Sequence, residues 1–451
     1  MVENIRLFLT LFYISSIINM KGGYNMSLKK EGYLNRLIDE TIMIHLKLFG
    51  AISIEGPKWC GKTWTSLNHA NSCADLSVKS FRDNARENPK LIYSYKYPQL
   101  IDEWQKAPNI WDDVRHECDS DNINGKYILT GSTSLLKEDE EEISHSGTGR
   151  ISPLKMYTMS LYESKDSTGH VSIMDMYNDK VKEGYEGEID LRRLAYLIIR
   201  GGWPKNLNID EKYANILPKS YITSILEKDI HERKDKRRDK NKMESLIKSL
   251  ARNESSMISI KGIINDIEEY ESNQKLIKDE ETINDYISVL NDLYLIENQS
   301  AYGLNYRASA RVGKSSKRHL TDPSLACAAI NITADKLIND HETFGIYFEA
   351  LVERDLRIYM NYLNGNLYHF KDNTSGDEVD AILEFENGEY GAVEIKLSAN
   401  SVESAKKSLM NFYSNVSKKP KFMCIIAGTQ ISIKKDKETG IYIIPITSLR
   451  A

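Results

Sequence analysis

The sequence has few of the residues that build metal centres or disulfide frameworks. It contains five cysteines, an odd number, and no two of them share a CxxC spacing. This pattern is typical of unpaired thiols in a reducing compartment. The nine histidines are scattered along the chain and build no zinc motif.

Positive charge is not in excess either. Lys and Arg number 60 against 65 for Asp and Glu, which gives a net charge of −5. A chain-wide basic surface for nucleic acid is therefore excluded, and any such contact needs a local patch. The stretch ERKDKRRDKNK at 232–242 mixes both signs, which favours a solvated helix or linker over such a patch.

No long apolar run marks a membrane span. The run LFLTLFYISSII, from Leu7 to Ile18, is shorter than the roughly 20 residues that cross a bilayer. A signal segment is the alternative, but no small-x-small cleavage site follows the run. We expect residues 1–25 to be a dispensable extension before Met26, a membrane not to be a partner, and the chain to be cytoplasmic.

The remaining composition is that of a globular protein with several domains. The chain has 451 residues, of which 41% are hydrophobic and 28% charged, so roughly two to four domains are expected. Short strands are predicted at 51–55 (AISIE), 100–104 (LIDEW) and 127–132 (YILTGS), with helical patterns between them. This alternation predicts an α/β fold with a parallel sheet.

A phosphate-binding loop follows the first of these strands. The stretch GPKWCGKT fits GxxxxGK[ST] at every fixed position, with the residues Gly56, Pro57, Lys58, Trp59, Cys60, Gly61, Lys62 and Thr63. Glycines let backbone N–H groups curl round phosphate oxygens at a helix N-terminus. Lys62 is expected to reach the β- and γ-phosphates of ATP, and Thr63 to hold Mg²⁺. The alternative is a chance loop.

Polar residues end the next two predicted strands. Asp102 is expected to join the Mg²⁺ shell, and Glu103 to orient or activate the attacking water. Thr130 and Ser132 end the YILTGS strand, where a polar side chain can sense the γ-phosphate; a plain strand-end turn is the alternative. Arg150, beside two glycines in HSGTGRI, is a candidate transition-state arginine, in cis or from a neighbouring subunit, with a surface arginine as the alternative.

These motifs together resemble one family. The stretches LIDEWQKAPNIWDDVR, YILTGS, HSGTGRISPLKMYTMSLYES, RGGWP and KRHLTDPSLA are similar to the prokaryotic family that joins an AAA-type P-loop ATPase to a carboxy-terminal domain of unknown function. The resemblance covers about residues 31–450 and implies ATP binding by Gly56 to Thr63, with Walker B roles for Asp102 and Glu103. The chain departs from the family at Trp64, where a second small hydroxyl residue is usual, and in the extension before Met26.

The middle of the chain, from about 185 to 300, is predicted to be helical. Three short helices ending in LYLIEN resemble a winged helix-turn-helix, a module that binds DNA or serves as a spacer. The third helix, Thr282 to Leu293, is acidic, which favours the spacer or a protein contact.

The last region has the element order helix, three strands, helix, strand after Phe344. This order is similar to the PD-(D/E)xK nuclease core. The resemblance implies that Asp380 and Glu394 bind a divalent cation, Mg²⁺ or Mn²⁺, that Lys396 orients water or stabilises charge, and that Glu349 is an auxiliary carboxylate. The alternative is an ordinary exposed hairpin, because short D…ExK matches are common and charges often alternate on exposed strands.

The hairpin register separates these alternatives. A two-residue turn at Asn387-Gly388 would put Asp380 on the face opposite to Lys396 and Glu394. A three-residue loop, 386–388 with Gly388 in a G1 bulge, pairs Phe385 with Glu389 and brings Asp380 opposite Glu394. The hydrophobic pattern and the metal site demand the same register, so we predict the three-residue loop.

The sequence therefore predicts a multi-domain α/β protein. The expected divisions are the extension 1–25, an AAA-type P-loop ATPase domain 26–165, a helical lid or linker 166–240, a winged-helix-like domain 241–330 and a nuclease-like domain 331–451. The hypothesis is an ATPase whose Mg·ATP cycle controls the last domain, with DNA or RNA and a homo-oligomer as partners. The alternative is a nucleotide-driven switch or binding module whose nuclease-like fold is inactive.

Overall fold

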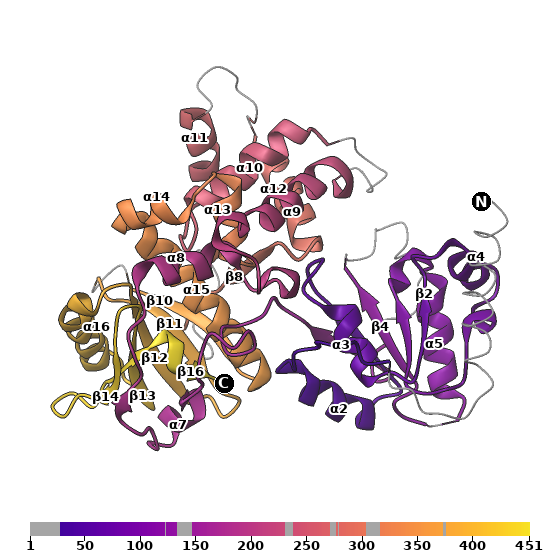
Figure 1. The fold of residues 1–451 in the computed structure, drawn as a ribbon, viewed down its shortest axis with the longest axis horizontal. Coiled ribbons are helices and arrows are strands. Elements are labelled where there is room, and N and C mark those ends of the chain that lie inside the picture. Colours follow the sequence, from indigo (N-terminus) through magenta and orange to yellow (C-terminus); the bar gives the residue numbers. More distant parts are fainter. Residues whose placement is uncertain are drawn as a thin grey trace.

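The computed structural model describes residues 28–121, 123–132, 147–230, 238–270, 277, 279–303, 316–372 and 376–451. Three regions stand apart in Figure 1: an α/β region in indigo and purple, a helical region in magenta to orange, and a second sheet in yellow. The apolar run at 7–18 and the acidic stretch at 138–142 lie outside the described residues. Within the described part, no helix is long and apolar enough to cross a membrane.

The first region is built on a five-stranded parallel sheet, as predicted. Its strand order is β2-β3-β4-β1-β5. The strands are β1 (Ala51–Glu55), β2 (Ser72–Asp75), β3 (Gln99–Asp102), β4 (Tyr127–Gly131) and β5 (Ile151–Lys155). The helices are α2 (Ile38–Leu48), α3 (Lys62–His69), α4 (Lys79–Glu87) and α5 (Asn109–Asp119).

Helices cover both faces of this sheet because its central strands are apolar on both sides. Ile52 and Ile54 of β1 pack in one cluster with residues of α2 and α3, such as Ile42 and Leu67. Ala51 packs on the other side, in a cluster that includes Val114 of α5. Strands buried on both faces are the rule in parallel sheets. The carboxyl ends of β1, β3 and β4 therefore meet at one edge.

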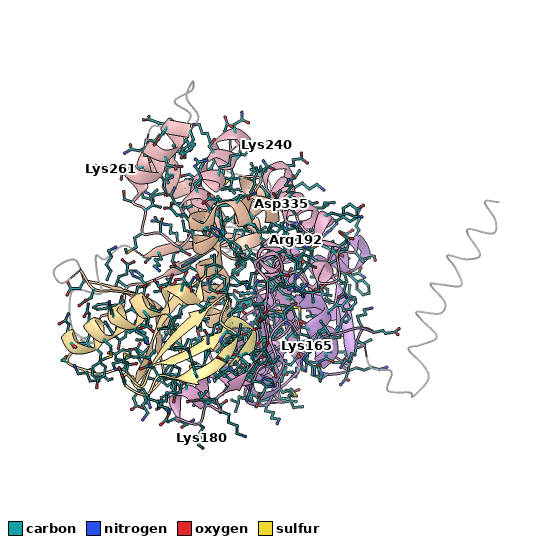
Figure 2. The ribbon with its side chains drawn as sticks, turned by 60° about the vertical axis from the view of Figure 1, so that its left-hand side comes forward. Lys165, Lys180, Arg192, Lys240, Lys261 and Asp335 are labelled. Atoms are coloured by element: carbon teal, nitrogen blue, oxygen red, sulfur yellow. The ribbon has the colours of Figure 1, made fainter. Side chains whose placement is uncertain are left out.

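The helical region confirms the prediction for about residues 185–300. Its helices are α8 (Leu191–Arg200), α9 (Ile216–Ser224), α10 (Lys240–Arg252), α11 (Ile260–Tyr270) and α12 (Glu280–Asp292). An antiparallel strand pair follows, β8 (Ile296–Gln299) and β9 (Lys317–Leu320), then α13 (Pro323–Ala329) and α14 (Ala334–Asn339). At its surface Arg192 of α8 and Asp335, labelled in Figure 2, form an exposed 3.0 Å ion pair, which adds little stability.

The segment predicted as a helical lid or linker, 166–240, contains strands as well as helices in its first part. Two short strands there, β6 (Val171–Ser172) and β7 (Gly184–Tyr185), flank α7 (Ile173–Tyr177). β6 pairs with β16 (Leu449–Arg450), and β7 pairs with β14 (Ser432–Lys435). Their partners lie more than 200 residues further along the chain, so local periodicity carries no trace of them.

The last region contains the predicted helix-strand order. It begins with α15 (His341–Tyr362) and continues through β10 (Asn366–Lys371), β11 (Glu378–Glu384), β12 (Tyr390–Lys396), α16 (Val402–Asn415) and β13 (Phe422–Ala427). With β14 and β15 (Tyr442–Pro445) they form a sheet of order β10-β11-β12-β13-β15-β14-β7. α16 packs on β11 to β13, and α15 contacts β10 and β12. The side chains of Ala381 and Val393 join the core that includes α15, whereas Ile382 and Ala392 join the core that includes α16.

A buried polar joint connects the three regions. Asp322, fully buried, accepts hydrogen bonds from Thr158 Oγ1 (2.9 Å), from the Gly202 amide (2.9 Å) and from Arg354 (3.1 Å). A Cβ on Gly202 would collide with the backbone of Met159, so the RGGWP stretch needs its glycine there. The RGGWP and TDP motifs that carry the family resemblance thus fasten the regions to one another.

Candidate functional site

The phosphate-binding loop lies between the end of β1 and the start of α3. Gly61, the residue before α3, has φ 108°, and Gly56 has φ 153°. A Cβ on Gly56 would collide with the carbonyl oxygen of Met156, so both glycines are required by the backbone. Amide groups at the N-terminus of α3 are thereby presented to the open side of the loop, an arrangement that suits an anion.

Lys62 is held by neutral groups of the loop itself. Its side chain is buried, and Nζ donates to the carbonyl oxygens of Gly56 and Pro57, each at 2.8 Å. Its ammonium thus lies inside the curl of the loop, as predicted for a lysine that meets phosphate oxygens.

The carboxylate predicted to serve a metal lies beside the loop. Thr63 Oγ1 is 3.1 Å from both carboxylate oxygens of Asp102, and the hydroxyl of Thr130 donates to the same carboxylate. β3 and β4 are neighbours in the sheet, and Asp102 pairs with Thr130 in register. Burial raises the pKa of Asp102, although hydrogen bonds from Thr130 and Thr63 oppose the shift.

Glu103 and Ser132 are also brought together at this edge. Glu103 has φ 57°, in the left-handed region, and its Oε2 accepts from Ser132 Oγ at 3.2 Å and from Gln105 Nε2 at 2.6 Å. A non-glycine residue in this conformation carries a backbone cost, and functional sites are one place where such a cost is retained. The turn aims the carboxylate of Glu103 across the sheet edge instead of along the strand.

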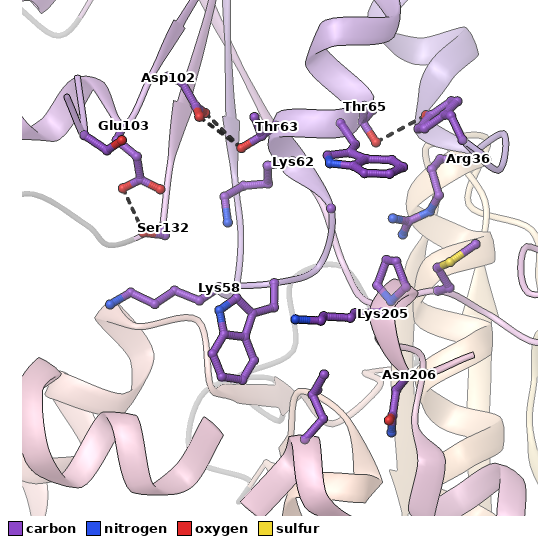
Figure 3. A pocket seen from close by; sticks show the side chains of 18 of the residues that line it. Arg36, Lys58, Lys62, Thr63, Thr65, Asp102, Glu103, Ser132, Lys205 and Asn206 are labelled. Carbon is purple, nitrogen blue, oxygen red and sulfur yellow. Dashed lines mark hydrogen bonds between the residues drawn. The ribbon is translucent and has the colours of Figure 1, made fainter. Parts of the chain in front are cut away.

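These residues line a cleft of about 1500 Å³ between the first region and the helical region. Figure 3 shows Lys62 and Lys205 facing the same open space from opposite walls, with the Thr63–Asp102 contact above Lys62 and the Ser132–Glu103 contact to its left. Cationic side chains and backbone amides thus face a carboxylate-hydroxyl pair. The donor set fits a nucleotide phosphate chain with a hard divalent cation such as Mg²⁺.

Arg36 was not predicted from the sequence, although it supports the loop. This buried side chain donates from Nη1 to Cys60 O at 2.8 Å, from Nη2 to Tyr157 O at 2.8 Å and from Nε to Glu163 at 3.0 Å. It joins the loop to the segment that follows β5. The only local signal is an arginine beside an apolar helical pattern, and its partner Glu163 is 127 residues away.

Arg150 is not brought to the cleft. It precedes β5, and its carbonyl oxygen accepts the amide of Ala51, the first residue of β1. The phosphate loop follows the other end of β1, roughly 15 Å away for five residues at about 3.3 Å each. Arg150 instead forms a 2.5 Å ion pair with Asp119. The predicted role in cis is therefore wrong, because it assumed that the glycine-rich loop reached the catalytic edge.

The hairpin of β11 and β12 has the predicted three-residue loop. Phe385 N donates to Glu389 O at 2.9 Å, Gly388 N donates to Phe385 O at 2.8 Å, and Gly388 has φ 75°. The ladder pairs Ala381 with Val393, as predicted. Beyond that pair the strands stop exchanging backbone hydrogen bonds, and the carboxylate of Asp380 accepts the Ile395 amide at 2.8 Å.

Lys396 contacts both of the predicted carboxylates of this hairpin. Lys396 Nζ is 3.3 Å from Asp380 and 2.7 Å from Glu394, and Ser408 of α16 donates to Glu394 at 3.1 Å. Burial raises the pKa of Glu394 to about 7, with Asp380 adding to the shift. Burial alone would lower the pKa of Lys396, but the carboxylates of Asp380 and Glu394 raise it above its ordinary value.

Glu349 of α15 interacts electrostatically with Asp380, and two residues that were not predicted, Lys317 and Glu353, lie with it. Lys317 of β9 is buried, with Nζ 2.7 Å from Glu349 and 3.3 Å from Glu353. Burial raises the pKa of Glu349 to about 8, with Asp380 and Glu353 adding to the shift. The KRHLTD stretch carried a family resemblance, but nothing in its spacing predicted that Lys317 would reach this hairpin.

As arranged, this cluster does not fit a divalent cation. Among the described residues, no three or more His, Cys, Asp or Glu side chains are placed to hold a metal ion together. The carboxylates of Asp380, Glu394, Glu349 and Glu353 each contact an ammonium group instead. The chemistry is that of a metal-binding set, whereas the geometry is that of internal ion pairs.

Comparison with known families places part of the chain. Residues 49–165 match the AAA domain family. Residues 191–336 match a domain of unknown function, DUF8612, and residues 344–449 match another, DUF4143. The first region is accordingly an AAA-type P-loop domain. No curated protein matches the chain.

Several solved structures resemble the chain weakly. A Walker-type ATPase of Pyrococcus abyssi is 11% identical with a TM-score of 0.42, covering 69% of this chain and 99% of its own. The replication initiator DnaA, bound to AMPPCP and single-stranded DNA, is 12% identical with a TM-score of 0.27, covering 58% of this chain and 89% of its own. The Aeropyrum pernix ORC1 protein, in complex with DNA, is 12% identical with a TM-score of 0.25, covering 72% of this chain and 97% of its own. These TM-scores are too low to carry an inference about function.

Proposed function

We propose that the AAA-type P-loop domain binds Mg·ATP in the cleft and hydrolyses it. The observation that carries this proposal is the convergence of the loop, the Thr63–Asp102 pair and Glu103 at one edge of the sheet. At this edge the charged groups of Lys62 and Asp102 are held by neutral partners: Lys62 contacts carbonyl oxygens and Asp102 contacts hydroxyls. Such an arrangement favours a ligand that brings both phosphate charge and a cation.

The residues of this edge take distinct roles. Lys62 exchanges its two carbonyl contacts for phosphate oxygens, and the amides at the start of α3 bind the same oxygens. Thr63 and Asp102 hold Mg²⁺, which when bound neutralises charge on the phosphate chain. Glu103, oriented by Ser132 and Gln105, positions a water molecule and accepts its proton.

We further propose that the nucleotide state controls the last region, whose strand order supports a PD-(D/E)xK nuclease-like fold acting on DNA or RNA. The strand pair β8–β9 and the helices before it, which support a winged-helix-like module, connect the two. Tyr294, just before β8, donates to Glu55 at 2.8 Å, and Glu297 of β8 lies 2.8 Å from Lys155. Glu55 is the residue before the phosphate loop, so a change in the loop acts directly on this module.

A second candidate function is a nucleotide-driven switch whose last region binds a partner without cleavage. The ion-paired carboxylates of that region favour it, because each already has an ammonium neighbour. Nucleic-acid binding would then depend on a local basic patch. Assembly into a homo-oligomer would bring a transition-state cation from a neighbouring subunit to the cleft.

One assay separates these candidates. The purified chain is incubated with DNA or RNA, with and without Mg²⁺ or Mn²⁺ and with ATP or a non-hydrolysable analogue. Metal- and ATP-dependent cleavage that Asp380→Asn abolishes supports the nuclease. Hydrolysis of ATP with no cleavage under any condition supports the switch. A chain that neither binds nor hydrolyses ATP contradicts both.

A further inference from the structure

The cleft has apolar walls beside its phosphate-binding edge. Lys62 and the Thr63–Asp102 pair belong to that edge, where the loop and α3 meet. Several large apolar residues that line the same cleft are exposed, namely Leu34, Trp59, Trp64, Ile209, Tyr213 and Ile216. Exposed apolar residues are ordinary when they are scattered singly, whereas a group of them inside a concave site indicates a surface for a ligand.

Trp64 stands where the phosphate-binding edge meets these walls. It follows Thr63 in the first turn of α3, and the residue is 47% exposed. Side chains of an α-helix lean toward its N-terminus, so the indole is carried toward the end of α3 that suits phosphate. A nucleotide held at that end by its phosphates places its ribose and base along the wall beside it.

The two exposed tryptophans of the cleft differ in what they contact. The ring of Trp59 lies 4.9 Å from the ring of Tyr221 in α9, in an edge-to-face arrangement. Within the part of the chain that the structure describes, the Trp64 side chain has no aromatic, hydrogen-bonded or charged partner. An indole offers a large flat apolar face together with an N–H donor, and covering such a face is favourable. Trp64 therefore presents an uncovered aromatic face to the cleft.

The phosphate loop does not require an aromatic residue at this position. The family that the chain resembles usually has a small hydroxyl residue in place of Trp64. On the neighbouring turn of the same wall, Tyr33 donates to Thr65 Oγ1 at 3.2 Å, which holds the segment 32–34 beside α3. The indole thus adds a face to the cleft without altering the groups that suit phosphate.

We propose that Trp64 is a stacking platform for the base of the bound nucleotide and that it favours purine nucleoside triphosphates. The indole covers one side of the base, and Ile209 and Tyr213 supply apolar surface from the helical region. An aromatic ring stacks on any base, and preferences among bases follow stacking strength. The two-ring purines therefore bind more tightly than the one-ring pyrimidines. The inference rests on the proposed function, since it names the nucleotide class of the same site.

The first experiment separates contact with the base from contact with the phosphates. Calorimetry measures the affinity of the full chain for ATP, UTP and inorganic tripolyphosphate, each with Mg²⁺. Trp64→Ala should weaken ATP binding by about tenfold or more, weaken UTP binding less, and leave tripolyphosphate binding unchanged. Trp64→Phe, which keeps an aromatic face, should retain most of the affinity for ATP. The matched control is Tyr185→Ala, which truncates an exposed aromatic residue outside the cleft.

The outcomes distinguish this inference from the proposed function. Equal losses of affinity for ATP and tripolyphosphate in Trp64→Ala would show that the indole supports the loop and not the base. Unchanged affinity for ATP would show that it contacts neither, and either result overturns the inference. Lys62→Ala should weaken both ligands together, because it removes a contact to phosphate. A parent chain that binds neither ligand would contradict the proposed function, and the inference with it.

The second experiment uses tryptophan fluorescence and does not depend on a truncated side chain. A base stacked on the indole should quench its emission, so ATP should quench the parent more than tripolyphosphate does. This ATP-specific quench should disappear in Trp64→Phe and persist in Trp59→Phe, which changes the other exposed tryptophan of the cleft. Equal quenching by tripolyphosphate and ATP would mean that the indole reports closure of the cleft and not the base. A quench that persists in Trp64→Phe would also overturn the inference.

Discussion

The two sheets present lysines and carboxylates in opposite ways. At the edge of the first sheet, Lys62 contacts carbonyl oxygens and Asp102 contacts hydroxyls, so the acid and the base are both held by neutral groups. On the last sheet, Lys396 contacts Asp380 and Glu394 directly. The first edge lines a cleft of about 1500 Å³, whereas the carboxylates of Glu349 and Glu353 beside the last sheet are paired with the buried Lys317 of β9.

This difference separates a site prepared for a charged ligand from one that is neutralised internally. Groups held by neutral partners keep their charge available to a ligand, because binding replaces weak contacts with stronger ones. Groups paired with one another must first be separated, and separation costs most where both are buried. We therefore expect substitutions at the first site to change ligand binding, and substitutions at the second to change stability.

The largest effect is expected for Lys62→Ala. Loss of the ammonium removes a charge-assisted contact to the phosphate chain, so ATP turnover should fall by roughly 100-fold or more, together with nucleotide affinity. Steady-state hydrolysis and titration with a fluorescent nucleotide measure the two quantities. Lys47→Ala, which changes an exposed lysine in the last turn of α2 away from the cleft, is the control. If Lys62→Ala hydrolysed ATP at the parent's rate, this loop would not be the site of hydrolysis.

Glu103→Gln should affect turnover without affecting binding. The amide keeps the shape of the side chain but cannot accept a proton, and general base catalysis contributes about 100-fold or more. The left-handed backbone of Glu103 is retained, so nucleotide affinity should match that of the parent. Parallel measurement of Kd and kcat distinguishes this result from a distorted cleft, in which both would change.

Lys396→Met should mainly lower stability. Without the ammonium, Asp380 and Glu394 face each other with less compensation, which costs about 1–3 kcal/mol for this partly exposed lysine. The matched change Lys62→Met removes hydrogen bonds to carbonyl oxygens and should cost about 1 kcal/mol or less. Urea unfolding measures the loss of stability in each variant. Equal losses would contradict the expected difference between the two sites.

Glu254→Gln should alter the dependence of stability on pH. Burial raises the pKa of Glu254 to about 8 from an ordinary value of 4.5, and Glu353 adds to the shift. The folded chain then retains a proton that the unfolded chain releases, so this residue's contribution to stability falls as pH rises from about 4.5 to about 8. Glutamine mimics the neutral acid and should flatten this slope, by up to about 5 kcal/mol over the window, because each pKa unit corresponds to about 1.4 kcal/mol. Melting temperatures measured at several pH values, from roughly pH 5 to roughly pH 8, give the slope for parent and variant. Identical slopes in the two proteins would contradict the assignment.

The smallest effect is expected for Arg150→Ala. The side chain lies at the opposite end of β1 from the phosphate loop and is paired with Asp119 at the surface. At low protein concentration we expect unchanged nucleotide affinity and turnover. If the arginine acts from a neighbouring subunit, turnover per chain rises with concentration in the parent but not in the variant. Rates that do not depend on concentration would leave Arg150 a surface residue.

The sequence predicted those parts of the fold that depend on residues close to one another along the chain. The phosphate loop, the acidic end of β3 and the hairpin register each depend on residues within a few positions of one another. The register near the loop could be predicted because only one loop length puts Ala381 opposite Val393. The irregularity further along β11, which sends Val379 to the core of Ile382 instead of that of Ala381, was not predicted.

The parts that were missed depend on contacts between distant residues. Arg36 binds Glu163, and Lys317 binds Glu349, across 127 and 32 residues respectively. A buried lysine or arginine looks like any surface cation until its acidic partner is known. Arg150 was misplaced for a related reason, because its glycine neighbours say nothing about which end of the sheet they occupy.

The pairing of β6 and β7 with strands between residues 432 and 450 also constrains how the chain is made. Ser167 donates to Leu449 O at 2.7 Å across a separation of 282 residues. At about 5–20 residues per second, a ribosome needs roughly 15–55 s to synthesise that interval. The P-loop domain is complete before it begins, whereas β6 and β7 remain unpaired edge strands throughout. During that interval they are open to pairing with other chains, so a slow or stalled ribosome should raise aggregation through this segment.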